Sequence, residues 1–198
     1  MTAKTIFDLA GAILPTGSPK DAALIIIDAQ EEYRTGSLKL SGLEAALANI
    51  QPLLAHWRKN GGTIIHVQHH AEGLFDPSGP FAAIMPEVAP TASEAVITKS
   101  VPSAFGGTKL EEFLEAANLK HVVLTGFMTH VCVSTTARVA DEKGYAVSVV
   151  SDATATRDLP DALDGSVVLA VDLHRSELTM LGDTFAKIVA TKDVLSAS

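Results

Sequence analysis

Residues 121–136 read HVVLTGFMTHVCVSTT. The first part is an apolar run rich in β-branched residues that ends at Gly126, and a helical pattern then extends to about Gly144. This order predicts a strand, a short connection and a helix, with Cys132 close to the helix N-terminus. Backbone N–H groups and the helix dipole favour a thiolate over a thiol at such a position. Alternatively, a lone cysteine is a small buried apolar residue.

A second strand and helix are predicted closer to the N-terminus. Residues 22–27 form a continuous apolar run, which is typical of a parallel strand covered on both faces. A helix is predicted over 41–60, with Ser41 as its N-cap and Glu44 completing a capping box. Further strands are expected over 63–68, 95–98, 121–125, 146–150 and 185–190, and further helices over 108–118, 131–143 and within 159–174.

The alternation of strands and helices predicts the fold class. It indicates an α/β protein with a three-layer, doubly wound parallel sheet and right-handed crossovers. We expect a single domain over 21–198, preceded by an N-terminal arm over 1–20 that proline and glycine residues interrupt. The long connection over 69–93 is expected to be a functional loop. In such sheets, ligands bind beyond the carboxyl ends of the strands.

The composition narrows the possible function classes. The chain has 198 residues, of which 47% are hydrophobic and 19% charged, so it is globular and not disordered. A formal net charge of -8 argues against nucleic acid as a partner, and no stretch resembles a membrane span. One cysteine excludes an intrachain disulfide, and no signal peptide is recognised at the N-terminus. We therefore expect a soluble cytoplasmic protein.

Three reactive side chains lie at the carboxyl ends of predicted strands. Asp28 follows the first strand, Lys99 the third and Cys132 the fourth. Since the carboxyl ends of parallel strands lie at one edge of the sheet, we expect these side chains to meet. A thiol becomes a nucleophile with the help of a base and a cation. Asp28 can take the thiol proton and return it to a leaving amine, and Lys99 can lower the thiol pKa.

Two of these residues also have simpler interpretations. Asp28 can be a loop-start or helix-capping aspartate, although no helical pattern begins until Ser41. Lys99 can extend its ammonium group to solvent. The occurrence of all three side chains at strand ends favours the catalytic interpretation.

With these residues in this order, the chain resembles the isochorismatase-like cysteine hydrolases. That family includes nicotinamidases and the N-carbamoylsarcosine, biuret and ureidoacrylate amidohydrolases. The resemblance extends from about residue 23 to residue 189. The motifs that carry it are LIIIDAQ at 24–30, KSVPSAF at 99–105, GFMTHVCV at 126–133, TARVA at 136–140, GY at 144–145 and DA at 152–153.

The resemblance implies a Rossmann-like isochorismatase fold with sheet order 3-2-1-4-5-6 and an Asp28–Lys99–Cys132 catalytic triad. It also implies a cis peptide bond between Phe127 and Met128, and an oxyanion hole formed by the backbone N–H groups of Met128 and Cys132. The implied reaction is thiolate attack on an amide carbonyl, loss of ammonia or an amine, and hydrolysis of the resulting thioester by water.

The sequence departs from two branches of that family. Nicotinamidases carry an Asp-x-His metal-binding motif, which is missing after Asp28, so we expect no metal and no other cofactor. His69 and His70 open the long connection and can contact substrate, bind a metal weakly or be solvated. The branch that cleaves the vinyl ether of isochorismate lacks the cysteine, so the presence of Cys132 argues against it.

Further residues are candidates for the substrate pocket. Gln30 lies two residues after the expected base, so it shares a strand face with it and can bind substrate or have a structural role. Tyr33 and Phe105 can form a wall of the pocket or belong to the core. Phe127 and Thr129 flank the expected oxyanion position, where Thr129 is expected to support the turn.

These observations predict a metal-independent cysteine hydrolase that cleaves a C–N bond of a small amide, ureido or carbamoyl compound. One alternative is an isochorismate-type vinyl-ether hydrolase that uses Asp28 and Lys99, and another is a non-catalytic sensor that uses the Cys132 thiol. The expected partner is a small molecule, with no nucleic-acid or membrane partner, and the chain is expected to form a homodimer or homotetramer. The connection over 69–93 is expected to select the substrate.

Overall fold

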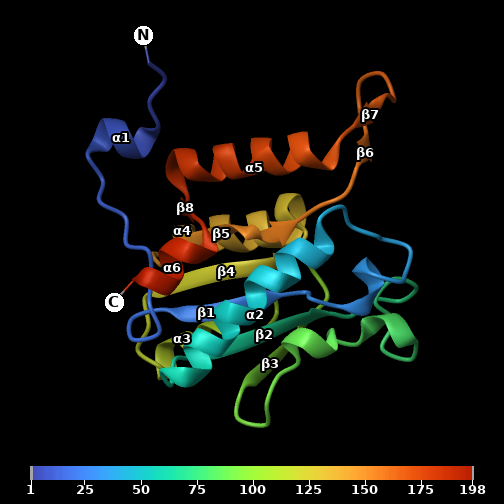
Figure 1. The fold of residues 1–198 in the computed structure, drawn as a ribbon, viewed down its shortest axis with the longest axis horizontal. Helices are drawn as coiled ribbons and strands as arrows, with labels where there is room; N and C mark the ends of the chain where they lie inside the picture. Colours follow the sequence, from blue (N-terminus) through green and yellow to red (C-terminus); the bar gives the residue numbers. More distant parts are fainter. Residues whose placement is uncertain (1, 198) are drawn as a thin grey trace.

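A parallel β-sheet forms the centre of the molecule (Figure 1). The computed structural model describes residues 2–197. The strands of the sheet are β1 (Ala23–Ile27), β2 (Ile64–His69), β3 (Ala95–Lys99), β4 (His121–Phe127), β5 (Ala146–Ala155) and β8 (Lys187–Val189). Their order is β3-β2-β1-β4-β5-β8, and every neighbouring pair is parallel.

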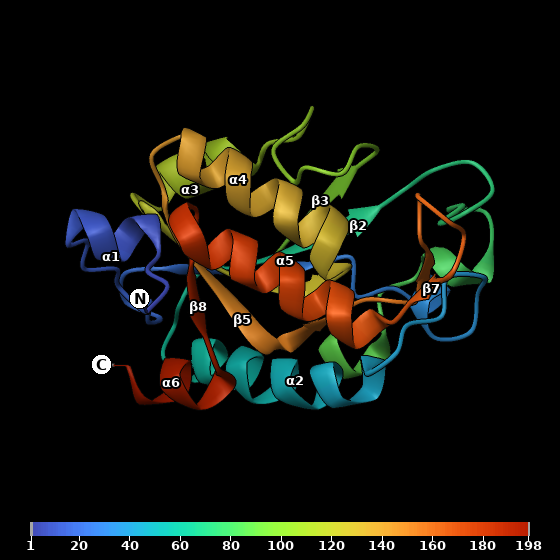
Figure 2. The ribbon, with the colours of Figure 1, turned by 90° about the horizontal axis from the view of Figure 1, so that it is seen from above.

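Helices cover both faces of the sheet and complete three layers. One face carries α2 (Leu43–Lys59) and α6 (Thr191–Ser196), and the other carries α3 (Leu110–Ala116), α4 (Ser134–Glu142) and α5 (Ala170–Thr184), as Figure 2 shows. The strands therefore have an apolar layer on each side.

The two cores explain why the sequence of β1 has no polar alternation. All of its residues are buried. Leu24 and Ile26 belong to the core beneath α2, whereas Ile25 and Ile27 belong to the core beneath α3 and α4. Since successive side chains of a strand point to opposite faces, a strand covered on both faces has to be apolar at every position.

The strand order confirms the predicted fold class. The sheet is doubly wound, and its order agrees with the 3-2-1-4-5-6 arrangement that the resemblance implies, because β8 is the sixth strand of the sheet. The intervening β6 (Leu159–Pro160) and β7 (Val167–Val168) pair with each other in a separate antiparallel hairpin. Strand β1 lies between β2 and β4, so the carboxyl ends of β1 and β4 bound the crevice in which ligands bind in such sheets.

Strand β5 is longer than the sequence pattern predicts. The apolar run predicts 146–150, whereas the strand extends to Ala155. The extension pairs with β4 through Gly126 opposite Thr154 and Phe127 opposite Ala155, after an irregularity in the register. A neighbouring strand therefore stabilises a segment whose own sequence turns polar.

The helix predicted within 159–174 is wrong in its position. The first part of this segment forms the β6–β7 hairpin, and α5 begins at Ala170. The Asp158 Oδ1 atom accepts a hydrogen bond of 2.7 Å from the Ala170 N–H, so a side chain before the hairpin satisfies a backbone donor at the start of the helix.

The predicted capping box of α2 is also wrong. The chain enters α2 through Gly42, which has a φ of 77° and no side chain with which to cap the helix. Ser41 instead donates its backbone N–H to the Thr156 carbonyl at 3.1 Å, which ties the start of α2 to the end of β5. Glu44 forms an ion pair of 2.8 Å with Arg34 and does not reach back to the helix N-terminus.

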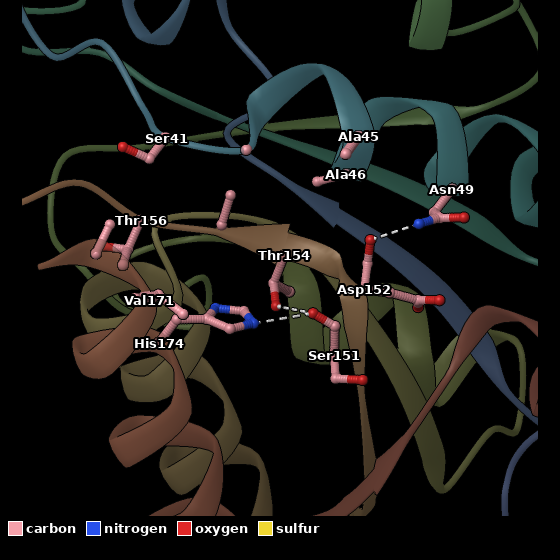
Figure 3. Close-up of a pocket in the computed structure, with 13 residues that line it drawn as sticks. Ser41, Ala45, Ala46, Asn49, Ser151, Asp152, Thr154, Thr156, Val171 and His174 are labelled. Atoms are coloured by element: carbon pink, nitrogen blue, oxygen red, sulfur yellow. Dashed lines mark hydrogen bonds between the residues drawn. The ribbon is translucent and has the colours of Figure 1, made fainter.

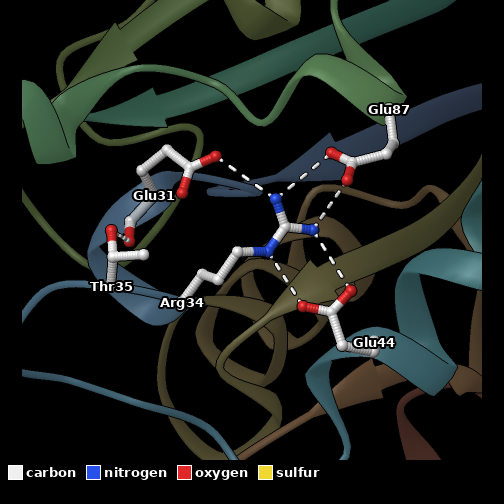
Figure 4. A network of polar contacts seen from close by, with 5 residues as sticks. All are labelled: Glu31, Arg34, Thr35, Glu44 and Glu87. Atoms are coloured by element: carbon white, nitrogen blue, oxygen red, sulfur yellow. Dashed lines mark hydrogen bonds and ion pairs between the residues drawn. The ribbon is translucent and has the colours of Figure 1, made fainter.

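Arg34 fastens the connection after β2 to the rest of the molecule (Figure 4). Its guanidinium lies 2.8 Å from Glu44, 2.9 Å from Glu87 and 3.3 Å from Glu31. Glu87 belongs to the 3₁₀ turn Pro86–Val88, whereas Glu44 lies in the first turn of α2. One cation therefore joins the 3₁₀ turn around Glu87, 53 residues away in the sequence, to the start of α2.

The N-terminal segment contains one short helix. Helix α1 (Ile6–Ala10) is capped by Thr5, and the Ile6 N–H donates a hydrogen bond of 2.9 Å to Asp183 on α5. This contact places the segment beside α5. None of the helices within residues 2–197 combines the length and hydropathy that crossing a bilayer requires.

Candidate active site

The side chains of Asp28, Lys99 and Cys132 lie together at the carboxyl edge of the sheet. Lys99 Nζ is 2.7 Å from Asp28 Oδ2 and 3.3 Å from Cys132 Sγ. Asp28 directly follows β1 and Lys99 ends β3, whereas Cys132 lies in the π-helical turn Thr129–Val133 between β4 and α4. The doubly wound topology thus brings three residues from distant parts of the chain into contact.

The backbone allows this approach at two unusual positions. Gly126 has a φ of 102°, and a Cβ atom there would lie 2.0 Å from the Ile27 carbonyl oxygen, so only glycine fits between β4 and the end of β1. Asp28 has a φ of 48°, and its N–H donates a hydrogen bond of 2.8 Å to Val67 on β2. The carboxylate therefore extends from a backbone held by both neighbouring strands.

Lys99 is the centre of the cluster. Its ammonium donates a hydrogen bond to the Cys132 sulfur and contacts His69 Nδ1 at 3.0 Å. It also forms an ion pair with the Asp28 carboxylate, whose two oxygens have no hydrogen-bond partner among residues 2–197. His69, which was predicted as a substrate contact, therefore binds the lysine of the cluster in this structure.

Burial controls the protonation of the acid and the thiol. Asp28, Lys99 and Cys132 are 0%, 2% and 7% exposed. Burial raises the pKa of Asp28 to about 6, and the Lys99 charge opposes that rise. Burial and the Asp28 charge raise the pKa of the Cys132 thiol to about 12, against the opposing effect of the Lys99 charge. At neutral pH, the carboxylate is charged and the thiol keeps its proton.

This protonation state corrects the sequence-based expectation of a thiolate. Lys99 acts in the predicted direction, but burial and the Asp28 charge together outweigh it at Cys132. In addition, α4 begins only at Ser134, so the sulfur precedes the helix in a turn of its own. The thiol consequently loses its proton only when a reaction supplies the driving force.

His69 is neutral beside the charged lysine. Burial, together with the charges of Lys99 and His70, lowers its pKa to about 4. Since the imidazole carries no charge at neutral pH, its Nδ1 atom can accept the Lys99 N–H while Nε2 keeps the proton.

The turn that carries Cys132 is held by hydrogen bonds on both sides. The Phe127–Met128 peptide bond is cis, and the Met128 carbonyl accepts the N–H groups of Val131 and Val133 at 3.1 and 3.2 Å. The buried Thr129 hydroxyl lies 2.9 Å from His174 Nδ1. These contacts fix the backbone immediately before and after the nucleophile.

Tyr33 and Phe127 form an aromatic layer beneath the site. Their ring centroids are 5.8 Å apart in an edge-to-face arrangement, and Phe75 lies 5.2 Å from Tyr33 on its other side. Tyr33 is 2% exposed and Phe127 is fully buried. Both side chains thus belong to the core on the α2 face of the sheet.

Gln30 has a structural role in this structure. Its side chain is fully buried, its Oε1 accepts the His69 N–H at 2.7 Å, and its Nε2 donates to the carbonyls of His69 and Ala82 at 3.0 and 2.6 Å. The amide therefore joins the end of β1 to the end of β2 and to the 69–93 connection. Both of its polar atoms are occupied within the protein, so the predicted substrate contact is not seen.

The aromatic contact of Phe105 lies away from the three clustered side chains, and its predicted place in a pocket wall stays a prediction. Its ring packs 5.8 Å from that of Tyr145, and Lys143 Nζ lies 5.8 Å above it. These partners lie beyond the C-terminal end of α4, whereas Cys132 precedes its N-terminal end. The helix of 9 residues spans about 13 Å at 1.5 Å per residue. The Ala104 N–H bonds Thr136 in the first turn of α4 at 2.9 Å, so the backbone just before Phe105 lies near the start of that helix.

A separate cavity of about 360 Å³ opens beside the end of β5 (Figure 3). Small side chains of α2, among them Ala45 and Ala46, line it together with residues of β5 and α5. His174 lines this cavity and donates from Nε2 toward the Ser151 carbonyl at 3.1 Å, while its Nδ1 contacts Thr129. The cavity is therefore next to the turn of the nucleophile, but none of the three clustered residues lines it.

Within residues 2–197, no three side chains of His, Cys, Asp or Glu lie close enough together to hold a metal ion. His69 contacts Lys99, and His66 is buried with its Nε2 atom 2.9 Å from Glu94. The side chains of His66 and His69 therefore have partners within the protein.

The sequence pattern did not indicate Arg157. The structure places it two residues after Ala155, at the carboxyl end of β5. Because the sequence pattern predicts that this strand ends at residue 150, it does not identify Arg157 as a residue at a strand end. The recurrence of small and β-branched residues over 153–156 is the signal that could have extended the strand.

Comparisons with known proteins agree with this geometry. The model of the isochorismatase domain family matches residues 22–193, which is most of the chain. The chain belongs to the isochorismatase family. This isochorismatase-family protein is 41% identical over 182 residues to the secreted isochorismatase effector Isc1 of Verticillium dahliae, covering 90% of this chain and 93% of the relative.

Two further relatives of this family member come from Pseudomonas putida. The crystal structure of an isochorismatase from strain KT2440 superposes with a TM-score of 0.93 at 43% identity, covering 98% of this chain and 100% of the other. Maleamate amidohydrolase is 28% identical over 198 residues, covering 90% of this chain and 87% of the relative. The chain is thus an isochorismatase-family hydrolase with relatives of amidohydrolase type.

Proposed function

We propose that this hydrolase cleaves a C–N bond of a small carboxamide, ureido or carbamoyl compound through a thioester intermediate. In this mechanism Cys132 is the nucleophile and Asp28 is the general base. The observation that carries the proposal is that one buried ammonium, that of Lys99, contacts both of them. The amidohydrolases among the relatives support the choice of a C–N bond.

The first half of the reaction begins from a protonated thiol beside a charged carboxylate. As the Cys132 sulfur attacks the carbonyl carbon, a C–S bond forms and the thiol proton moves to Asp28. The backbone N–H groups of Met128 and Cys132 stabilise the resulting oxyanion. Asp28 then returns the proton to the leaving nitrogen, the C–N bond breaks, and ammonia or an amine departs from the thioester.

The second half of the reaction hydrolyses the thioester. Asp28 takes a proton from a water molecule as its oxygen attacks the thioester carbonyl. The C–S bond breaks, and the sulfur recovers a proton from Asp28 as the acid product leaves. The Lys99 ammonium, 3.3 Å from the sulfur, stabilises the negative charge that develops there in both halves. The balance is one amide and one water converted into one acid and one amine.

Ammonia release from a panel of small amides, ureas and carbamoyl compounds tests the proposal. We expect release by the wild type, no change with EDTA, and a loss of at least about a thousandfold in Cys132→Ala, since covalent catalysis requires the sulfur. Circular dichroism checks that the variant is folded. Mass spectrometry of the wild type mixed with substrate and acid-quenched should show an acyl adduct on Cys132. An active, folded Cys132→Ala protein would overturn the mechanism.

The same experiment distinguishes the alternatives raised by the sequence. Cleavage of isochorismate by Cys132→Ala, with activity lost in Asp28→Asn, would favour a vinyl-ether hydrolase. Rapid oxidation of the thiol without any turnover would favour a sensor. The raised pKa and 7% exposure of Cys132 oppose the sensor, because reactivity toward oxidants follows thiolate character and access.

Self-association remains part of the proposal. Large apolar side chains are exposed on the N-terminal segment and on the β6–β7 hairpin: Leu9 is 72% exposed, and Ile13 and Leu163 are each 96% exposed. Such surfaces favour a homodimer or homotetramer, which light scattering coupled to size-exclusion chromatography would detect. The cytoplasmic location stays a prediction, since a relative carries the name of a secreted effector.

A further inference from the structure

We infer that two side chains of α5, His174 and Glu177, are positioning residues that hold the two ends of the turn on which Cys132 lies. The N–H groups that are proposed to stabilise the oxyanion lie in this turn and immediately before it. The inference therefore rests on the proposed amidohydrolase function. Both residues act through the backbone of the turn and not by contact with the substrate.

The contact of His174 lies at the start of the turn. Its Nδ1 atom is 2.9 Å from the hydroxyl of Thr129, which is fully buried. Thr129 is the first residue of the turn and directly follows Met128, whose N–H is one of the two proposed oxyanion donors. A side chain of α5 therefore fixes the residue next to that donor.

The contact of Glu177 lies immediately after the turn. Its carboxylate accepts a hydrogen bond from the hydroxyl of Ser134, which follows the last residue of the turn and begins α4. Glu177 is buried, and Arg138 on α4 balances its charge at 3.0 Å. The carboxylate therefore holds the point at which the turn enters α4.

One helix supplies both contacts. His174 and Glu177 are three residues apart on α5, so their side chains share a face of the helix. Leu178 and Leu181 anchor α5 in the core on this side of the sheet, where both are buried. Since a single packed helix holds the residues before and after the nucleophile, the turn between them keeps its place relative to the sheet.

The partners of His174 determine its tautomer. A carbonyl only accepts hydrogen bonds, so the Nε2 atom, which lies 3.1 Å from the Ser151 carbonyl, carries the ring proton (Figure 3). Burial lowers the pKa of His174 and the Ser151 carbonyl opposes this effect, so the ring is neutral at neutral pH. The Thr129 hydroxyl therefore donates to Nδ1, and one ring joins β5 to the turn.

These contacts have a consequence for the rate. Backbone N–H groups stabilise an oxyanion best when they are already in place before its charge forms. The Cys132 sulfur is held separately, because Lys99 Nζ lies 3.3 Å from it. Loss of the His174 contact should thus displace the donors beside Thr129 and leave the sulfur in place. Because the oxyanion forms only after the substrate has bound, kcat should fall while KM changes little.

Two substitutions of His174 separate its two contacts. The amide oxygen of Asn can replace Nδ1, so His174→Asn keeps an acceptor for Thr129 and loses the contact with Ser151. The amide nitrogen of Gln can replace Nε2, so His174→Gln keeps the contact with Ser151 and loses the acceptor. For the amide that the wild type hydrolyses fastest, we expect kcat to fall about a hundredfold in His174→Gln, with KM within about threefold, and to fall less than about tenfold in His174→Asn.

Thr129→Val removes the same hydrogen bond from its other end and keeps the branched shape of the side chain. It should lower kcat as His174→Gln does, and the double variant should lose no more than either single variant. His121→Asn is the control, because His121 is buried at the opposite edge of the sheet, where its Nε2 atom lies 3.0 Å from Ser148. Loss of that contact should lower the melting temperature and leave kcat unchanged.

The second contact is tested at its own two ends. Ser134→Ala removes the donor, whereas Glu177→Gln keeps an acceptor oxygen for the Ser134 hydroxyl. We expect kcat to fall about tenfold in Ser134→Ala and less than about threefold in Glu177→Gln. A Ser134→Ala protein with the kcat of the wild type would overturn the role of Glu177.

Two measurements without turnover complete the test. Hydrogen–deuterium exchange of the amides over 128–134 should become at least about tenfold faster in His174→Gln and in Thr129→Val, but not in His174→Asn. Alkylation of Cys132 by chloroacetamide passes through no oxyanion, so its rate should change less than about threefold in all three variants.

The outcomes distinguish this inference from the proposed function. Faster exchange in His174→Gln, with no amide hydrolysed by the wild type, would support the positioning role while the hydrolase proposal fails alone. Hydrolysis that requires Cys132, together with unchanged kcat and unchanged exchange in His174→Gln, would overturn the positioning role and leave the hydrolase proposal intact. Parallel losses of kcat and of alkylation would also overturn it, because they would place the defect at the sulfur. If His174→Gln does not fold, Thr129→Val decides.

Discussion

Replacing Lys99 by methionine should destabilise the protein in a pH-dependent way. The substitution keeps the length of the side chain and removes the ammonium that lies 2.7 Å from Asp28 Oδ2. Asp28 is fully buried, so the variant leaves a carboxylate without its counter-charge in the interior. Removing one partner of a buried ion pair typically costs about 3–5 kcal/mol, because the remaining charge is uncompensated.

The structure gives the direction of the pH dependence. Burial already raises the pKa of Asp28 from 3.8 to about 6 in the presence of Lys99, so the buried carboxylate costs about 3 kcal/mol at neutral pH, at 1.36 kcal/mol per pKa unit. Because the folded pKa lies above the unfolded one, this cost is absent below pH 3.8 and grows as the pH rises through the folded pKa. Without Lys99 the pKa of Asp28 rises further, so the cost keeps growing to a higher pH.

Urea unfolding of the wild type and of Lys99→Met between pH 5 and pH 8 measures this effect. We expect the free energy of unfolding of the variant to be about 3–5 kcal/mol lower at pH 8, and the difference to shrink markedly at pH 5. The double variant Asp28→Asn/Lys99→Met removes both charges and should recover most of the loss at pH 8. A deficit that is the same at every pH, or a double variant less stable than Lys99→Met, would refute the reasoning.

Two further predictions concern the site and its surroundings. The kcat/KM for an amide should fall about tenfold per pH unit below about pH 6, because Asp28 acts as a base only when it is deprotonated. A flat profile of kcat/KM from pH 5 to pH 7 would exclude Asp28 as the base. Phe105→Leu should lower the melting temperature and leave kcat/KM within about twofold of the wild type, since the ring packs on Tyr145 beyond the C-terminal end of α4. A large loss of activity in a folded variant would instead place Phe105 in the substrate pocket.

The architecture could be predicted because it follows from local patterns. A strand covered on both faces is apolar at nearly every position, and residues 22–27 and 122–124 have this property. Asp28 and Lys99 interrupt or end such runs, so the topology rule for doubly wound sheets was sufficient to expect them at one edge. Both arguments use only the order and the polarity of neighbouring residues.

The details that failed depend on contacts between distant segments. The cap of α2 was misplaced because Ser41 bonds Thr156, more than a hundred residues later. The end of β5 was misplaced because pairing with β4 extends a segment that contains Asp152. The contact of Phe105 with Tyr145 could not be predicted either, because the path of a loop depends on the helix against which it packs.

The chemical state of the site was likewise decided by tertiary structure. The sequence alone was enough to name an acid, a cation and a thiol and to expect them together. Only the assembled fold encloses Asp28 and Cys132 so completely that the carboxylate titrates near pH 6 and the thiol keeps its proton. Burial depends on atoms contributed by every layer of the protein, and no local pattern of residues records how much water those atoms exclude.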